Sequence, residues 1–161
     1  QAFTGLYPTY LVEQKGLSSS TAALLFSLFF ACGVVVKPAA GVAYDRIGAR
    51  GSLVGALAGP VVGLGFLPVV DSLPALVVLT ALVSTMLGSG AITQSFLSEA
   101  FSEEIRGTGL GAVRTTAATL GAVGPVLFGV VADRGYFDEG YFVLAGIMLA
   151  AILLALRLPD S

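Results

Sequence analysis

The feature that most constrains this chain is a pair of long uncharged segments separated by a short charged one. Residues 16–36 contain no Asp, Glu, Lys or Arg, and neither do residues 51–70. Each run has roughly twenty residues, the length that an α-helix needs to cross about 30 Å of hydrocarbon. Their apolar residues do not alternate with a polar face, as they would in an element half exposed to water. Two membrane-crossing helices joined by a charged turn are therefore predicted.

The composition points to lipid surroundings and argues against several other classes of protein. Hydrophobic residues make up 56% of the 161 residues and charged residues 11%, whereas about a quarter of a soluble domain is charged. The net charge of −2 gives no basic surface for nucleic acid. The chain has no His and one Cys, Cys32, so it lacks the commonest general base and any metal-ligand spacing. We expect no enzyme, no metal and no cofactor.

The charged segment between the two runs reads Gly41-Val-Ala-Tyr-Asp45-Arg46-Ile-Gly48-Ala-Arg50. Asp45 can cap helix N–H groups, and Gly48 can adopt a turn conformation that residues with a Cβ disfavour. Gly41 is expected to end the first helix where two backbones come close. The spacing G-x-x-x-D-R-x-G-x-R resembles the cytoplasmic loop signature of the major facilitator superfamily of secondary transporters. A charged turn that only fixes topology is the alternative interpretation.

We expect an all-α fold, a polytopic membrane helix bundle that forms one unit over residues 1–161. Apolar runs and turn residues predict five full membrane helices after the end of an earlier one. The expected ranges are 1–12 for the partial helix and 19–44, 52–70, 73–98, 108–131 and 141–158 for the full helices. The chain starts without Met or a signal-peptide pattern, so we expect it to be a fragment.

The distribution of Lys and Arg predicts the orientation of the bundle, since basic residues concentrate on the cytoplasmic side. Lys15 and Arg134 fall on one predicted side. The other side would hold six: Lys37, Arg46, Arg50, Arg106, Arg114 and Arg157. The signature turn and residues 99–107 are therefore expected in the cytoplasm, and the turns at 71–74 and 133–140 outside. The expected location is the plasma or inner membrane.

Further stretches place the resemblance in the second half of a facilitator transporter, whose halves each contain two inverted three-helix repeats. The segments that resemble the seventh, tenth, eleventh and twelfth helices and their loops are Pro8-Thr-Tyr-Leu11, Glu99-Ala-Phe101 with Arg106-Gly107, Gly124-Pro125 with Gly129, and Leu158-Pro159. The hexamers at 41–46 and 129–134 also form a weak internal repeat. The resemblance implies a C-terminal half, from a partial seventh helix to the twelfth, that lacks its N-terminal half.

The resemblance implies movement of a small molecule by alternating access, whether by symport, antiport or facilitated transport. It also implies a cytoplasmic latch, with Asp45 facing a helix N-terminus of the other half and Glu99 paired with Arg46 or Arg50. The full set of latch residues is Gly41, Asp45, Arg46, Gly48, Arg50, Glu99 and Arg106. A membrane accessory or scaffold protein of the same fold that does not transport is the alternative function.

Two cations inside the predicted helices suggest the cargo. Lys37 lies eight residues before Asp45 and Arg114 eight after Arg106, which places both about 12 Å inside the cytoplasmic boundary. A cation at that depth commonly faces a partner or a water-filled cavity, so an organic anion such as a carboxylate is one expected cargo. Alternatively, Lys37 snorkels to the interface and Arg114 pairs with Glu99 or a helix end.

Several uncharged polar residues are candidates for the same path. They are Ser84, Thr85, Ser89, Gln94, Thr115 and Thr119. Ser and Thr also commonly bond their own helix backbone, which is the simpler interpretation. Tyr7 and Tyr10 are expected to be interfacial anchors rather than ligands.

Overall fold

The computed structural model describes residues 2–158, and within them the chain forms helices and no strand. The elements in chain order are α1 (Ala2–Glu13), α2 (Ser19–Phe66), the short 3-10 helix η1 (Leu67–Val69), α3 (Leu73–Ser84), α4 (Met86–Ala100), α5 (Arg106–Asp133) and α6 (Phe137–Ala155). The all-α prediction is confirmed. Residue 1 and residues 159–161, which include Pro159 of the segment that resembles the twelfth helix, lie outside the described residues.

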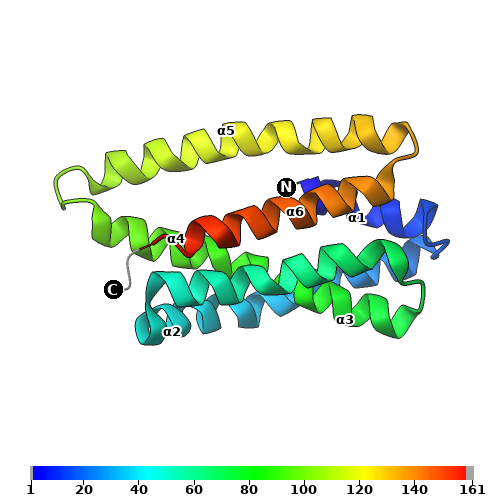
Figure 1. The fold of residues 1–161 in the computed structure, drawn as a ribbon, viewed down its shortest axis with the longest axis horizontal. Helices are drawn as coiled ribbons and strands as arrows, with labels where there is room; N and C mark the ends of the chain where they lie inside the picture. The colour runs from blue at the N-terminus through cyan, green and yellow to red at the C-terminus, as the bar shows by residue number, and fades with distance from the viewer. Residues whose placement is uncertain (1, 159–161) are drawn as a thin grey trace.

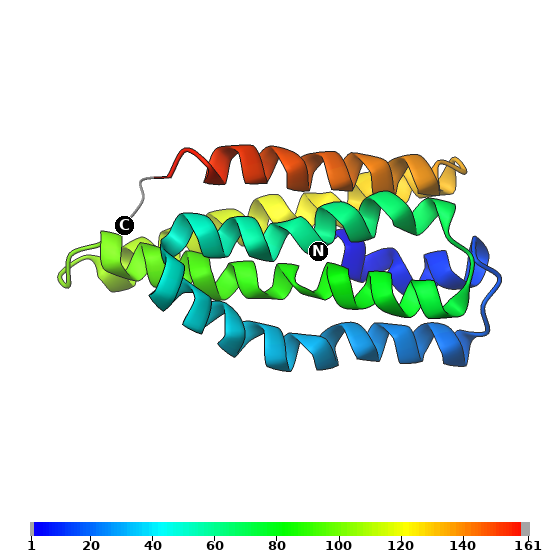
Figure 2. The ribbon, with the colours of Figure 1, turned by 60° about the horizontal axis from the view of Figure 1, so that its bottom comes forward.

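The long helices run back and forth along one common direction (Figures 1 and 2). α2 itself doubles back, so its first arm (residues 19–47) and its return arm (residues 49–66) are antiparallel. The turn at Gly48 and the α4–α5 loop lie at one end, which we call the Gly48 end. The α1–α2, η1–α3 and α5–α6 connections lie at the other, which we call the Asp71 end.

Four helical stretches are long and apolar enough to cross a membrane: Ser19–Val69, Leu73–Ala100, Arg106–Asp133 and Phe137–Ala155. The first contains both arms of α2. The segment expected as one helix over 73–98 is divided into α3 and α4 at Thr85, and α5 and α6 begin before the expected starts of 108 and 141.

The reversal of α2 depends on the backbone of Gly48. Its φ of 72° and ψ of 179° lie in a region that only Gly occupies without strain. Gly48 therefore supplies the turn conformation that the sequence predicts. The prediction for Gly41 is wrong, because Gly41 lies inside the helical first arm and a Cβ added to it would meet no atom within 4 Å.

The return arm of α2 packs closely against α3 through small residues. A Cβ added to Gly59 would lie 2.5 Å from the carbonyl oxygen of Leu82, so no side chain fits there. Close approach of backbones at Gly is a common way for membrane helices to pack. Thr85, at the break between α3 and α4, adds a polar contact, since its Oγ1 lies 3.0 Å from the carbonyl oxygen of Ala56. This contact lies at the break between α3 and α4, which the pattern of apolar residues did not predict.

An aromatic core fills the half of the bundle near the Asp71 end. Its rings come from α1, the first arm of α2, α5 and α6: Phe3, Tyr7, Tyr10, Phe29, Phe128, Phe137 and Tyr141. Tyr7 and Tyr10 are 0% exposed, so the expectation that they anchor at the interface is wrong. Their hydroxyls explain how Tyr is tolerated there: Tyr7 bonds Thr80, and Tyr10 donates to Asp138 at 3.0 Å.

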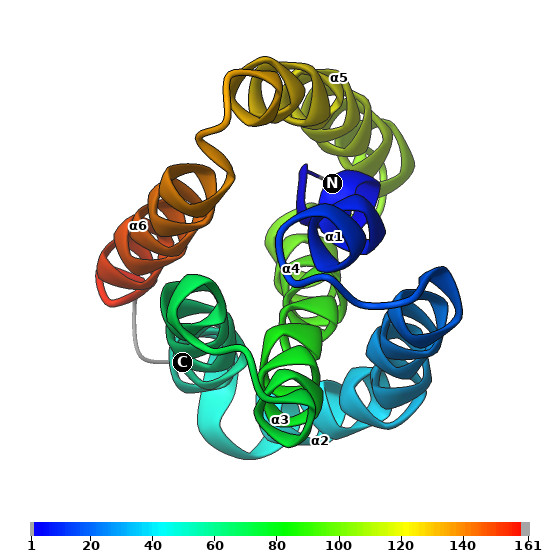
Figure 3. The same ribbon diagram turned by 90° about the vertical axis from the view of Figure 1, so that its right-hand side faces the viewer.

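The helix α5 lies at the edge of this arrangement. In the end-on view, α1 and α4 lie toward the middle, and α5 and α6 lie at the periphery (Figure 3). Only Phe128 and Ala132 of α5 are buried, and both are in its last two turns. The rest of α5 is half-buried or exposed, and every residue from 111 to 120 is exposed.

Replacing Gly48 with Ala is expected to lower the free energy of unfolding by about 1–3 kcal/mol, because a Cβ is strained at this φ and ψ. Thermal unfolding of the detergent-solubilised protein measures the change. Gly55→Ala is the matched control, since Gly55 lies in the helical return arm and an added Cβ meets open space. Equal melting temperatures for the two variants would contradict the role assigned to Gly48.

Candidate functional site

A cavity of about 570 Å³ lies between the first arm of α2, α4 and α5, toward the Gly48 end. We call it the Arg114 cavity. Its wall is largely apolar, and its polar lining side chains are Lys37, Ser89, Thr93, Gln94 and Arg114. Four of these are among the predicted path residues, which come together from three separate helices.

Helical periodicity explains which residues of α4 and α5 face the cavity. Ser89 and Thr93 are four residues apart on α4, and Leu110 and Arg114 are four apart on α5, so each pair lies on one helix face. Thr93 was not among the predicted residues, although its i+4 spacing from Ser89 indicates the shared face. At Gly88 the first arm of α2 comes so close that an added Cβ would lie 2.8 Å from that of Ala40.

The charge of the Arg114 cavity is positive. Lys37 and Arg114 both line it, and none of the described residues that line it is acidic. A guanidinium Nη2 of Arg114 donates a hydrogen bond to Oε1 of Gln94. A guanidinium has five N–H donors, and a single bond to a neutral amide orients it without neutralising it. This arrangement is suited to an anionic group.

The other predicted path residues lie elsewhere. Ser84 is buried and its Oγ donates to the carbonyl oxygen of Ala81 at 2.6 Å, while Thr119 donates to that of Thr115 at 2.9 Å. Thr85 contacts the α2 return arm as described above. Ser84 and Thr119 thus make the backbone bonds that are common for Ser and Thr within membrane helices. None of these four residues lines the Arg114 cavity.

The signature turn forms its own small cavity of about 330 Å³ at the Gly48 end. Asp45, Arg46 and Gly48 line it together with Tyr44 and Glu99. Oη of Tyr44 donates a hydrogen bond of 2.7 Å to Oε2 of Glu99. The turn and the end of α4 therefore meet, and Tyr44 is a contact residue that the sequence reasoning missed.

Arg106 lies across from Glu99 at the same end. Both residues line a third cavity, of about 520 Å³, which we call the Arg106 cavity. Gln94 lines this cavity as well as the Arg114 cavity. Arg50 is half-buried at the start of the α2 return arm, and Gly41 lies on the first arm outside these three cavities.

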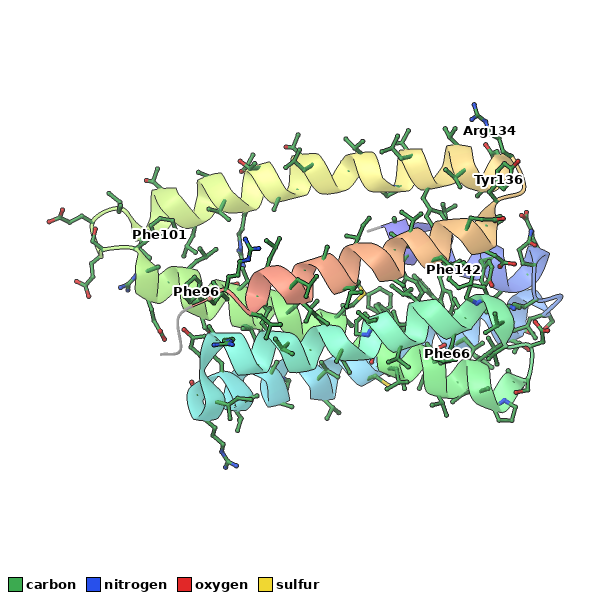
Figure 4. All side chains as sticks on the ribbon, in the orientation of Figure 1. Phe66, Phe96, Phe101, Arg134, Tyr136 and Phe142 are labelled. Atoms are coloured by element: carbon green, nitrogen blue, oxygen red, sulfur yellow. The ribbon has the colours of Figure 1, made fainter. Side chains whose placement is uncertain are left out.

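Polar contacts tie three elements together at the opposite, Asp71 end. Nζ of Lys15 lies 2.8 Å from both Oδ1 of Asp71 and the carbonyl oxygen of Pro68. The side chain of Lys15 is only 4% exposed, so these contacts compensate for its lost hydration. Figure 4 shows Arg134 and Tyr136 at this end and Phe101 at the far end of α5.

No group of three His, Cys, Asp or Glu in residues 2–158 is placed to hold a metal ion.

The family model described as the Major Facilitator Superfamily matches residues 1–161. A search of curated proteins found no match.

A hydrophilic thiol reagent is expected to reach the Arg114 cavity but not the outer face of α6. With Cys32 changed to Ser, Ala117→Cys in the cavity should react about tenfold faster or more than Ile147→Cys, because the reactive thiolate forms in water and not in lipid. Ile147 is a matched control since it is 55% exposed in the bundle and lies within a membrane-spanning helix. Similar slow rates at both positions would mean that the cavity holds no water.

Proposed function

The chain belongs to the major facilitator superfamily, and from that premise we propose that it forms part of a transporter that carries an organic anion, such as a carboxylate, by alternating access. Proteins of this family are multi-pass membrane transporters, so the activity is movement of a small molecule across a membrane. The observation that carries the proposal is the meeting of Lys37 and Arg114 in one cavity without an acidic lining residue.

Energetic considerations support an anionic cargo. A cation held within a membrane helix is costly unless it faces a partner or water. The partner of Arg114 is the neutral amide of Gln94, which leaves the positive charge uncompensated. A carboxylate can bind a guanidinium through two parallel hydrogen bonds, and such charge-assisted bonds are about twice as strong as neutral ones. The cargo would therefore supply the missing negative charge.

The contacts of Glu99 bear on the alternative in which Arg114 pairs with that carboxylate. Glu99 accepts a hydrogen bond from Tyr44, whereas Arg114 is bonded to Gln94, which lies about one and a half helical turns from Glu99 on α4. This separation favours a cargo-binding role for Arg114 over a structural ion pair. Lys37 is exposed, so its ammonium group can reach either the membrane interface or a cargo in the cavity. The effect of Lys37→Gln on uptake, described below, separates these two roles.

The exposed side of α5 supports the proposal that a second six-helix half completes the transporter. Arg114, Thr115, Thr116 and Thr119 all lie in the fully exposed stretch 111–120. Polar and charged residues facing lipid are unfavourable, so this stretch is better suited to a protein neighbour or a water-filled path. We assign the chain to the C-terminal half, with the N-terminal half as its partner and the Gly48 end in the cytoplasm.

The contact between the signature turn and α4 supports a latch at the Gly48 end. Asp45 and Arg46 share a cavity with Glu99, so their charges can change partners when the two halves rock. All three are exposed, and an exposed ion pair contributes only about 0.5–1 kcal/mol. A small contribution suits a switch between states that differ by a few kcal/mol.

Arg114→Gln and Lys37→Gln are each expected to lower kcat/KM for carboxylate uptake by about tenfold or more, since each removes a charge-assisted bond to the cargo. Uptake of carboxylates and of neutral sugars is compared in proteoliposomes that contain the full-length transporter. Arg134→Gln, at the Asp71 end, is the control for a change of net charge. Selective uptake of neutral sugars that Lys37→Gln leaves unaffected would exclude the anion proposal.

Asp45→Asn is expected to change turnover about two- to fivefold, because loss of roughly 0.5–1 kcal/mol from one closed state shifts the populations by that factor. Turnover is measured per correctly inserted molecule, with insertion checked by protease protection. Normal turnover of the correctly inserted variant would contradict the latch role of Asp45.

A further inference from the structure

The Arg106 cavity contains a cationic side chain whose hydrogen-bonding capacity is not used. Arg106 is half-buried, and its Nε is enclosed without a hydrogen-bond partner. Buried polar groups almost always have partners, and leaving a charged donor without one is costly. The cavity beside it, about 520 Å³, also receives the hydroxyls of Ser95 and Ser98 from α4. The site therefore has an unpaired donor and room for a ligand that accepts hydrogen bonds.

The start of α5 makes the same region more positive. Arg106 is the first residue of this 28-residue helix, and the N-cap residue, Ile105, provides no side-chain hydrogen bond. The first N–H groups of a helix lack partners within the helix and carry the positive end of its dipole. Both the side chain of Arg106 and the backbone that follows it thus favour an anion.

The acidic residue that lines this cavity, Glu99, already accepts a hydrogen bond from a residue outside the cavity. Glu99 lines the Arg106 cavity, but its Oε2 accepts the hydrogen bond from Tyr44 on the side of the signature turn. A carboxylate at Arg106 would therefore meet an acid whose charge is already partly engaged elsewhere.

Gln94 connects this cavity with the Arg114 cavity. Its side chain lines both, and its Oε1 accepts the hydrogen bond from Arg114. Arg106 and Arg114 are eight residues apart on α5, which corresponds to about 12 Å along the helix axis. Arg106 lines only the Arg106 cavity and Arg114 only the Arg114 cavity, so the two arginines would serve successive positions for an anion.

We propose that Arg106, with Ser95, forms a second carboxylate-binding site at the Gly48 end, in series with the site at Arg114 and Lys37. An anion at Arg106 passes Gln94 to reach Arg114, and a bidentate carboxylate on Arg114 would take that guanidinium from Gln94. This inference rests on the proposed function, since it assumes that the cargo is an organic anion.

Protection of cysteines from alkylation tests each cavity separately in the full-length transporter with Cys32 changed to Ser. Ser98→Cys reports on the Arg106 cavity and Ala117→Cys on the Arg114 cavity. The rate of reaction with N-ethylmaleimide is measured with and without acetate, succinate, benzoate or citrate, and the uncharged methyl ester of each acid is the ligand control. Each reporter is combined with Arg106→Gln, Arg106→Lys or Arg114→Gln.

Arg157→Gln is the matched charge control, because Arg157 is exposed, follows α6 at the same end and lines neither cavity. We expect at least one of the four carboxylates to protect Ser98→Cys even in the Arg114→Gln background. Arg106→Gln should raise the concentration required at Ser98→Cys about tenfold or more, as loss of a charge-assisted hydrogen bond predicts. Arg106→Lys should retain part of the protection, since it keeps the charge but not the planar fork.

The outcomes separate this inference from the proposed function. Protection of Ala117→Cys without protection of Ser98→Cys would overturn the second site and leave anion transport standing. Absence of protection at both reporters, with all four carboxylates, would overturn both. Protection of Ser98→Cys that survives Arg106→Gln, or that the methyl esters reproduce, would overturn the role of Arg106.

Discussion

The whole structure depends on one constraint: inside a membrane, the backbone must satisfy its own hydrogen bonds, because hydrocarbon offers none. Helices do this within a single segment, which is why α2 to α6 occupy nearly all of the described chain. Two positions, Gly48 and Thr85, depart from continuous helix. At Gly48 the chain leaves helical geometry in order to reverse, and at Thr85 a side-chain contact with the backbone of α2 accompanies the break between α3 and α4.

The two ends of the bundle differ in how they use polar groups. At the Asp71 end, Tyr10 and Lys15 make contacts that join α1 to η1, α6 and the turn before α3, next to a packed aromatic core. Toward the Gly48 end, the basic side chains of Lys37, Arg106 and Arg114 line cavities instead. The polar groups of the Asp71 end thus bond one another, while three basic side chains toward the Gly48 end line cavities.

Sequence patterns predicted the features that depend on local chemistry and missed those that depend on tertiary contacts. Long apolar runs are enough to indicate membrane helices, and the special conformation of Gly48 follows from its place in a charged turn. The burial of Tyr10 could not be predicted, since it requires a carboxylate 128 residues away. Similarly, the sequence indicated Lys37, Gln94 and Arg114 as separate candidates, but only the packing of α2, α4 and α5 shows that they line one cavity and that Thr115 and Thr119 do not.

The sparse packing of α5 has a mechanical consequence. Its two buried residues, Phe128 and Ala132, both lie near the Asp71 end, so few buried contacts hold the rest of the helix to the bundle. That part of α5 carries Arg106 and Arg114, and displacing it would disturb few buried contacts. Within the described residues, the two arginines proposed to bind cargo therefore lie on a stretch of helix with few buried contacts, which is the kind of segment that moves most readily.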